Sequence, residues 1–215
     1  LSDFLIKFVY AWKFSDINLM ISNEIHSGSK IQYHRNIQDR VAKLVPFLEL
    51  DSDPYIVLHD GKLKWIQDAY TFSNNFPYSE PFEGKFNYIR NSVKAVIDAY
   101  DGTVKFYVAD NSDPLIDTYS KIFPNIFRPL SEMPPDLREH IRYPIDIFKI
   151  QSNKYLEYHM QDSQIFYNNE DLWNIPQEKF GQSAELQKVE PYYLIMNFVR
   201  RRWKKILISI GALVF

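Results

Sequence analysis

Aromatic and polar side chains that could bind a ligand gather between residues 65 and 90. The rings are those of Trp65, Tyr70, Phe72, Phe76, Tyr78 and Phe82, and the polar groups are those of Asn74, Asn75, Glu80 and Arg90. Flat rings stack on the apolar faces of sugars and peptides, while amides and a guanidinium fix the orientation of such a ligand. The residues predicted to make a binding surface are Trp65, Tyr70, Tyr78 and Arg90. The alternative is that these rings pack in a hydrophobic core.

Carboxylates are the candidates for hydrolytic chemistry. Glycosidases place two carboxyl groups on either side of one cleft, roughly 5 to 10 Å apart. The candidates are Asp68, Glu80, Asp98 and Glu132, and nothing in their spacing pairs any two of them. Glycine loops for phosphate and the HExxH, GxSxG and EF-hand patterns are all absent from a sequence with 6 Gly. We therefore assign no catalytic residue.

Metal-binding patterns are weak in this sequence. The run from Asp110 to Asp113 offers oxygen ligands for calcium, but Asp113 followed by Pro114 is also typical of a capped helix start. The histidines are His26, His34, His59, His140 and His159, and they lack the spacing of metal ligands. We expect these histidines to be structural or surface residues, and we predict neither a metal site nor a cofactor.

Helical periodicity dominates the two ends of the chain. Residues 1–14 predict an amphipathic helix whose apolar stripe packs on the core. Contact of this stripe with a membrane surface is the alternative, which the lack of a strongly basic face disfavours. Further helices are predicted over residues 37–48, from Asp113 to Ile122, over 137–141 and from Pro144 to His159.

Two Asp-Gly pairs between apolar runs predict two β-hairpins. Around Asp60-Gly61 the register pairs Leu58 with Leu63 and Ile56 with Trp65, and we expect these four side chains to form the buried face. Around Asp101-Gly102 the same register pairs Ala99 with Val104, Ile97 with Phe106, Ala95 with Val108 and Asp98 with Lys105. Residues 72–86 between the hairpins predict an irregular aromatic loop.

The C-terminal part predicts a disordered loop over 181–188 and a last strand over 192–198. Residues 199–215 form a basic and then apolar tail. A tail of this kind fits the cytoplasmic flank of a truncated membrane span, a buried strand or a sequence-joining peculiarity.

Composition limits the classes of function. A formal net charge of −2 gives no field that would gather phosphate backbones, so we expect no nucleic-acid partner. Zero Cys excludes disulfide scaffolds and thiolate zinc sites but leaves the cellular compartment open. The chain begins at Leu1 without a signal pattern, and we expect it to be an interior piece of a longer gene product.

Several strings of this sequence resemble a widespread bacterial family, uncharacterised protein family 0182, over residues 1–198. The strings are Tyr33-His34-Arg35-Asn36-Ile37, the run from Trp65 to Thr71, Tyr78-Ser79-Glu80-Pro81, the run from Asn87 to Lys94, the run from Asp98 to Val104, and Pro129-Leu130-Ser131-Glu132-Met133-Pro134. The resemblance implies a multi-pass membrane parent with a large soluble portion on the extracytoplasmic side. The family brings no assigned reaction, and the tail departs from its pattern.

Together these features predict one α+β domain over residues 1–198, with an antiparallel sheet built on two hairpins and covered by helices from both ends. The expected function is a non-enzymatic envelope interaction or support module of a membrane protein. Its expected partners are its own transmembrane portion and an envelope glycan or protein. The alternative is a hydrolase or transferase that acts on an envelope polymer.

Overall fold

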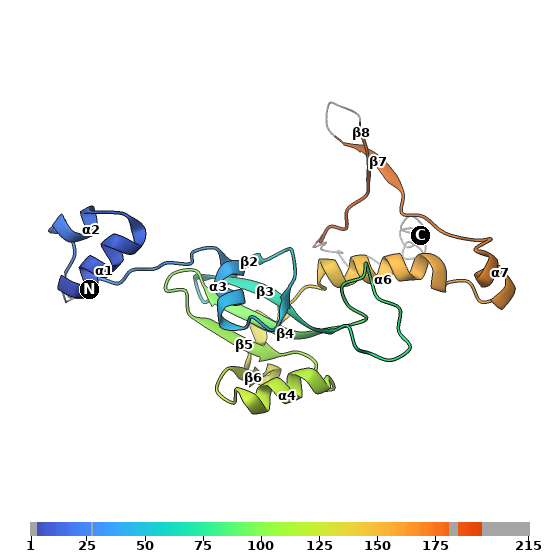
Figure 1. Ribbon diagram of the computed structural model, residues 1–215, viewed down its shortest axis with the longest axis horizontal. Coiled ribbons are helices and arrows are strands. Elements are labelled where there is room, and N and C mark those ends of the chain that lie inside the picture. Colours follow the sequence, from blue (N-terminus) through green and yellow to red (C-terminus); the bar gives the residue numbers. More distant parts are fainter. Residues whose placement is uncertain (1–3, 27, 181–184, 195–215) are drawn as a thin grey trace, which may run out of the picture. The chain divides into compact units, whose positions relative to one another are not determined.

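A six-stranded sheet with helices on both faces contains the hydrophobic core (Figure 1). The structure is a computed structural model that describes residues 4–26, 28–180 and 185–194. The helices are α1 (Phe4–Phe14), α2 (Asn18–Ile21), α3 (Ile37–Leu44), α4 (Pro114–Ile122), the 3-10 helix η1 (Leu130–Glu132), α5 (Pro135–Glu139), α6 (Ile145–Tyr158) and α7 (Ser163–Asn168). The predicted α+β class is confirmed.

The strands of the central sheet run in the order β1-β3-β4-β5-β6, and β2 also pairs with β3. They are β1 (Glu49–Leu50), β2 (Tyr55–His59), β3 (Lys62–Ser73), β4 (Tyr88–Asp98), β5 (Val104–Val108) and β6 (Phe127–Pro129). All pairs are antiparallel except β5 with β6, which is parallel. The sheet is therefore mixed and not purely antiparallel as predicted.

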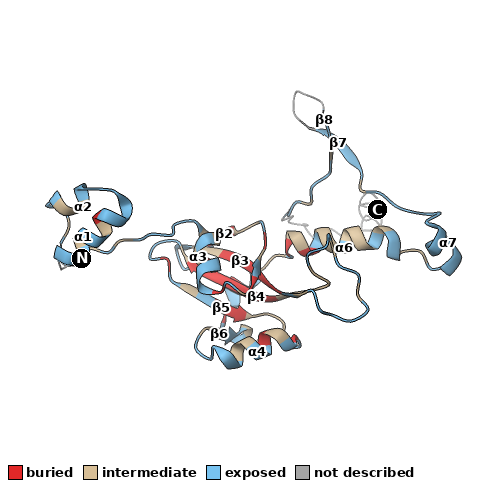
Figure 2. Ribbon diagram, viewed as in Figure 1, coloured by how far each residue is buried: buried red, intermediate tan, exposed pale blue. Residues whose placement is uncertain are grey.

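The long strands β3 and β4 are buried on both faces in their middle parts. The residues of β3 from Ile66 to Thr71 and those of β4 from Ser92 to Ile97 are all buried. Successive side chains of a strand point to opposite faces, so a continuous buried run requires cover on both sides. Figure 2 shows the buried residues concentrated on these strands.

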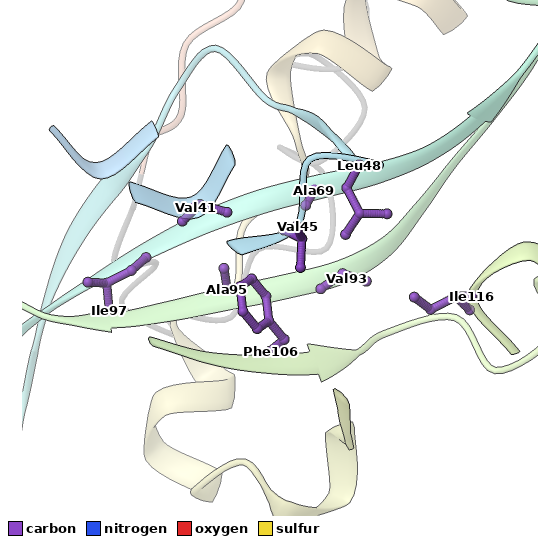
Figure 3. Packing of buried hydrophobic residues seen from close by; sticks show 9 residues of the cluster. All are labelled: Val41, Val45, Leu48, Ala69, Val93, Ala95, Ile97, Phe106 and Ile116. Carbon is purple, nitrogen blue, oxygen red and sulfur yellow. The ribbon is translucent and has the colours of Figure 1, made fainter. Parts of the chain in front are cut away.

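One face of the sheet packs against α3 and α4 (Figure 3). The buried residues of this cluster are Val41, Val45, Leu48, Ala69, Val93, Ala95, Ile97, Phe106 and Ile116. Asn36 starts α3 by accepting hydrogen bonds from the backbone N–H groups of Gln38 and Asp39. Asp113 starts α4 in the same way, as predicted, through the N–H of Leu115.

The opposite face packs against α5 and the turn before it. The buried residues of this second cluster are Tyr55, Val57, Ile66, Val96, Tyr107, Met133 and Leu137. Pro135 lies in the first turn of α5, where its missing N–H leaves no intrahelical bond unmade.

The β2–β3 hairpin has the predicted pairs but the opposite burial. Ile56 lies opposite Trp65 and Leu58 lies opposite Leu63. Ile56, Leu58 and Leu63 are nevertheless exposed, with Leu58 at 64%, and the predicted buried face is wrong. Tyr55 and Val57 are buried instead, because α5 covers the side of β2 to which they point.

The β4–β5 connection is a five-residue loop and not the predicted two-residue turn. Ile97 pairs with Val104, Ala95 with Phe106 and Val93 with Val108, so the register is shifted by two residues. Asp98 stabilises the longer loop, because its carboxylate accepts hydrogen bonds from the N–H groups of Tyr100 and Asp101. The predicted partner of Asp98, Lys105, is also wrong, since Asp98 forms an ion pair with Lys64 of β3.

Helix α1 forms as predicted, but its apolar stripe does not pack on a core. Ala11 is the one buried residue of this helix. Phe4, Leu5, Phe8, Val9 and Trp12 are all exposed.

The chain divides into two compact units, Leu1–Asn174 and Ile175–Phe215. In the second unit, β7 (Gln177–Phe180) pairs with β8 (Glu185–Lys188). Residues 185–188 therefore form a strand, and the predicted disordered loop over 181–188 is wrong for that part. Residues 192–194 are not in a strand, and the rest of the predicted last strand and the tail 199–215 lie outside the described residues. The predicted limits of the domain, residues 1–198, remain a prediction.

Each helix among the described residues is too short or too polar to span a lipid bilayer.

Candidate functional site

The β3–β4 loop, residues 74–87, is held in one conformation by the side chain of Asn87. Its Oδ1 accepts a hydrogen bond from the N–H of Phe76 at 3.0 Å, and its Nδ2 donates to the carbonyls of Phe76 at 2.7 Å and Ser79 at 3.1 Å. The Ser79 hydroxyl donates to the Asn87 carbonyl at 3.0 Å. A bridge between Phe82 and Phe86 closes the far part of the loop. These contacts bring both ends of the loop together.

Aromatic rings of this loop are exposed. Phe76 is half-exposed and stacks on Tyr88 with 5.5 Å between ring centroids, and Tyr78 is fully exposed. Tyr78 has a φ of 60°, in the left-handed region that bulky side chains rarely adopt. A strained residue persists only where its surroundings fix it, and such residues are common at ligand-binding sites.

The loop is also tied to α6. Lys154 of this helix forms an ion pair with Glu80 at 3.0 Å. The pair is largely exposed, and its contribution to stability is at most about 1 kcal/mol. Its effect is to limit where the loop can lie.

The four residues predicted to make a binding surface do not form one surface. Tyr78 is on the exposed loop and Arg90 is half-buried on β4, whereas Trp65 packs at the margin of the α3-side cluster. Tyr70 is buried, and its hydroxyl donates to Asp51 inside the protein. For Tyr70 the structure has the core packing that the sequence left as the alternative.

Arg90 lies beside the loop and holds the start of the β5–α4 connection. Its Nη1 donates to Asp110 at 2.7 Å and to the Ser112 hydroxyl at 3.0 Å. The guanidinium lies 6.0 Å from the centroid of the Tyr88 ring. The Ser112 hydroxyl and the Arg90 guanidinium, through their hydrogen bonds, lower the pKa of Asp110.

Asp113 joins the same region to the sheet. Its Oδ2 accepts hydrogen bonds from the hydroxyls of Thr71 and Ser92, and its Oδ1 accepts from Tyr88 at 2.8 Å. Burial raises the pKa of this carboxyl, but these hydrogen bonds and the cap bond from Leu115 outweigh it, so that the pKa is lowered. Protein donors thus bind both carboxylate oxygens of Asp113, one of the residues of the run Asp110 to Asp113 that could offer ligands to calcium.

A second buried polar group crosses the middle of the sheet. Lys94 of β4 forms an ion pair with Asp68 of β3, and both side chains are almost completely buried. Burial raises the pKa of Asp68, and Lys94 offsets part of that increase.

Asp51 is a further buried carboxylate. It accepts hydrogen bonds from the hydroxyl of Tyr70 and from the N–H of Asp146 at 3.0 Å. These bonds fix the start of α6 to β1 and β3.

The carboxylates predicted as hydrolytic candidates each pair with a different basic residue. Asp68 pairs with Lys94, Glu80 with Lys154, Asp98 with Lys64 and Glu132 with Arg128. Asp68 is inside the core and Glu80 is on an exposed loop. The structure therefore does not bring these four carboxylates together.

One group of possible metal ligands occurs among the described residues. It consists of His59, Asp60 and Asp136, whose ligand atoms lie within 4.8 Å of one another. Nδ1 of His59 lies 2.5 Å from Asp136, and Nε2 lies 3.6 Å from Asp60. The sequence missed this group because Asp136 is 77 residues from His59. The hydrogen bond with Asp136 explains the position of the imidazole without a metal.

The fold and the site define the class of protein: an α+β domain with polar side chains buried in its sheet and a hydrogen-bonded aromatic loop that joins the interior strands β3 and β4. Residues 1–210 match the profile of the uncharacterised protein family (UPF0182). The chain belongs to this family.

Relatives named UPF0182 protein occur in several bacteria. The chain is 52% identical over 196 residues to the protein of Pelotomaculum thermopropionicum, covering 91% of this chain and 21% of the relative. It is 55% identical over 203 residues to that of a Sulfurovum species, covering 92% and 22%, and 46% identical over 221 residues to that of Trichodesmium erythraeum, covering 94% and 24%. The chain thus spans about a fifth of the length of these relatives. No solved structure matches it.

Proposed function

We propose that this chain is a non-catalytic interaction module of a larger bacterial membrane protein, on the extracytoplasmic side of the membrane. Its contact surface for the envelope is the loop 74–87, and the ligand that the surface fits best is a glycan. The fully exposed ring of Tyr78 on a loop fixed by Asn87 is the observation that carries this proposal.

The small size of the exposed aromatic area favours a glycan over a protein. A stable protein interface buries about 800 Å² on each partner. An aromatic side chain offers roughly 150 to 250 Å², so Tyr78 and Phe76 together supply an area closer to that of one or two sugar rings. A strained loop that is already fixed would lose little entropy when the ligand binds.

The membrane location rests on different support. The resemblance to uncharacterised protein family 0182 implies a multi-pass membrane parent. The relatives are also between four and five times longer than the chain, which covers 21% to 24% of them. The enzymatic alternative requires two carboxylates across a common cleft. The pairing of each candidate carboxylate with a separate basic residue weighs against it.

Binding to isolated cell-wall glycan tests the contact surface. We expect Tyr78→Ala in the parent protein to reduce co-sedimentation with purified sacculi roughly tenfold, because it removes the ring that stacks on the sugar. Tyr100→Ala is the matched control, since Tyr100 is also an exposed tyrosine on a loop. Equal co-sedimentation of the two variants with sacculi would contradict the glycan surface. If Tyr78→Ala instead lost a bound protein, the ligand of this surface would be a protein.

Reporter fusions just before Leu1 and after Phe198 of the parent protein test the location. We expect activity from a reporter that works only outside the cytoplasm at both positions. Cytoplasmic reporter activity at both positions would overturn the extracytoplasmic assignment.

A further inference from the structure

Helix α1 has an unusual distribution of side chains. Its outward stripe consists of Phe4, Leu5, Phe8, Val9 and Trp12, which we call the α1 face. Phe4 is 70% exposed and Trp12 is 77% exposed. Phe4, Phe8 and Trp12 follow one another at intervals of four residues, as do Leu5 and Val9, so the five side chains lie on one side of the helix. Soluble helices normally turn such a stripe toward a core.

The inward side of α1 carries the side chain of Lys7. Lys7 is half-buried, and its Nζ donates a hydrogen bond to the carbonyl of Ile25 at 3.2 Å. Tyr10 and Phe14 stack at 6.0 Å on this side, and both contact the ring of Tyr33. The contacts fix the rotation of the helix, so the α1 face cannot turn inward without breaking them.

The basic residues of α1 do not serve the α1 face. Helices that lie on a membrane surface use lysine or arginine on their polar side to reach anionic lipid headgroups. Here Lys7 bonds within the protein, and Lys13 lies 4.7 Å over the ring of Tyr33. The chemistry of the face is therefore that of an apolar protein contact.

The area of the α1 face is large for a free surface. With about 150 to 250 Å² for each aromatic side chain, the exposed surface of the five residues is on the order of 600 Å². The largest apolar patch on a typical monomer is about 300 to 600 Å², so the α1 face reaches the upper end of that range. A patch of this size is close to one side of a standard protein interface.

We propose that the α1 face docks on an apolar surface of the same polypeptide, in the part that lies outside this chain. The chain covers 21% of one relative and 24% of another, so about four fifths of a full-length relative is available to supply that surface. Docking would bury the rings of Phe4, Phe8 and Trp12 as a compact group, of which Phe8 and Trp12 already pack edge to face at 6.2 Å. The proposal goes beyond the glycan surface and does not depend on it.

Site-specific photo-cross-linking in the parent protein tests this docking. A photoreactive amino acid replaces Trp12 in one variant and Leu5 in a second, and it replaces Tyr100 in the control. Tyr100 is 79% exposed, so the control matches Trp12 in exposure. We expect positions 12 and 5 to give cross-links to residues of the same polypeptide outside residues 1–215, and position 100 to give none there.

Other cross-linked products would overturn the proposal. Attachment to lipid would mean a membrane-surface helix, and attachment to a differently tagged second copy would mean an interface between copies. Absence of cross-links at both positions, or cross-links confined to residues 1–215, would mean that the α1 face docks on nothing outside this chain. Sacculus binding by the Trp12 variant, compared with that of Tyr78→Ala, separates failure of this docking from failure of the glycan surface.

Discussion

At the scale of single residues, Asp113 joins three elements that are far apart in the sequence. Its carboxylate accepts hydrogen bonds from Thr71 of β3, Ser92 of β4 and the first turn of α4. The sequence predicted the cap, because Asp followed by Pro is a local signal. It did not predict the three hydroxyl partners, Thr71, Ser92 and Tyr88, because nothing in the local sequence shows which strand residues reach the cap.

We expect Asp113 to make the stability of the fold depend on pH. Its folded pKa is below the unfolded value of about 3.9. The stabilisation is therefore fully present above the unfolded pKa and is lost as the pH falls through the folded pKa. Replacement by Asn should cost roughly 1 to 3 kcal/mol at pH 6, since charged hydrogen-bond acceptors bind more strongly than neutral ones.

Thermal unfolding of the wild type and of Asp113→Asn, followed by tryptophan fluorescence between pH 6 and pH 3, measures this effect. The difference between the two unfolding midpoints should be largest near pH 6 and should shrink below about pH 4. Gln164→Ala, at an exposed position in α7, is the control. A difference that stays constant over the whole range would show that the charge of Asp113 is not the cause.

The Lys94–Asp68 pair shows why part of the site escaped the sequence. Lys94 lies between the apolar residues Val93 and Ala95 on β4, and Asp68 follows the polar Gln67 on β3. Charged residues in such strand patterns are normally assigned to a solvent face. α5 and the residues before it cover that face, so the two charges had to be buried together. Removal of one partner would leave an uncompensated charge in the core, which typically costs about 3 to 5 kcal/mol.

At the scale of the elements, the two hairpins show what a turn signal can and cannot predict. Asp60-Gly61 specified both the turn and the pairing of β2 with β3, because the two-residue turn fixes the register. It did not specify which face is buried, because both faces of the hairpin carry apolar side chains. The decision came from α5, which covers Val57 and leaves Leu58 open.

Substitutions in β2 should follow the observed burial. We expect Val57→Ala to lower the free energy of unfolding by roughly 2 kcal/mol, because it leaves a cavity against α5. Leu58→Ala should change it by at most about 0.5 kcal/mol, because the side chain is already exposed. Denaturant unfolding of both variants makes the comparison, and a larger loss for Leu58→Ala would support the burial that the sequence first suggested.

The register predicted for the second hairpin was wrong because of one side chain, that of Asp98. Asp101-Gly102 gives the same local signal as Asp60-Gly61, and Gly102 does have a positive φ of 71°. Asp98 competes with the two-residue turn because its carboxylate caps two N–H groups of the loop. Its hydrogen bond from Lys64 lowers the pKa of Asp98 and keeps the carboxylate charged for these bonds. Because Lys64 is on another strand, a local sequence pattern does not predict that it pairs with Asp98.

At the scale of the whole molecule, the hydrophobic contacts of the described residues concentrate in the first unit. Both core clusters lie before Asn174, and the second unit contributes a separate two-stranded sheet. The stability of β3 and β4 should therefore depend on residues of the first unit. This follows because buried apolar area is the dominant favourable contribution to folding.

Cleavage between the two units tests this independence. A specific protease site inserted between Asn174 and Ile175 of the parent protein should allow cleavage without loss of the sheet. We expect the amide protons of residues 66–71 and 93–97 to keep their protection from hydrogen exchange after the cut, since their partner strands and covering helices lie in the first unit. Protein without the inserted site, treated with the same protease, is the control. A rise in exchange at these amides of tenfold or more would mean that residues after 174 stabilise the sheet, because a tenfold rise corresponds to about 1.4 kcal/mol of lost protection.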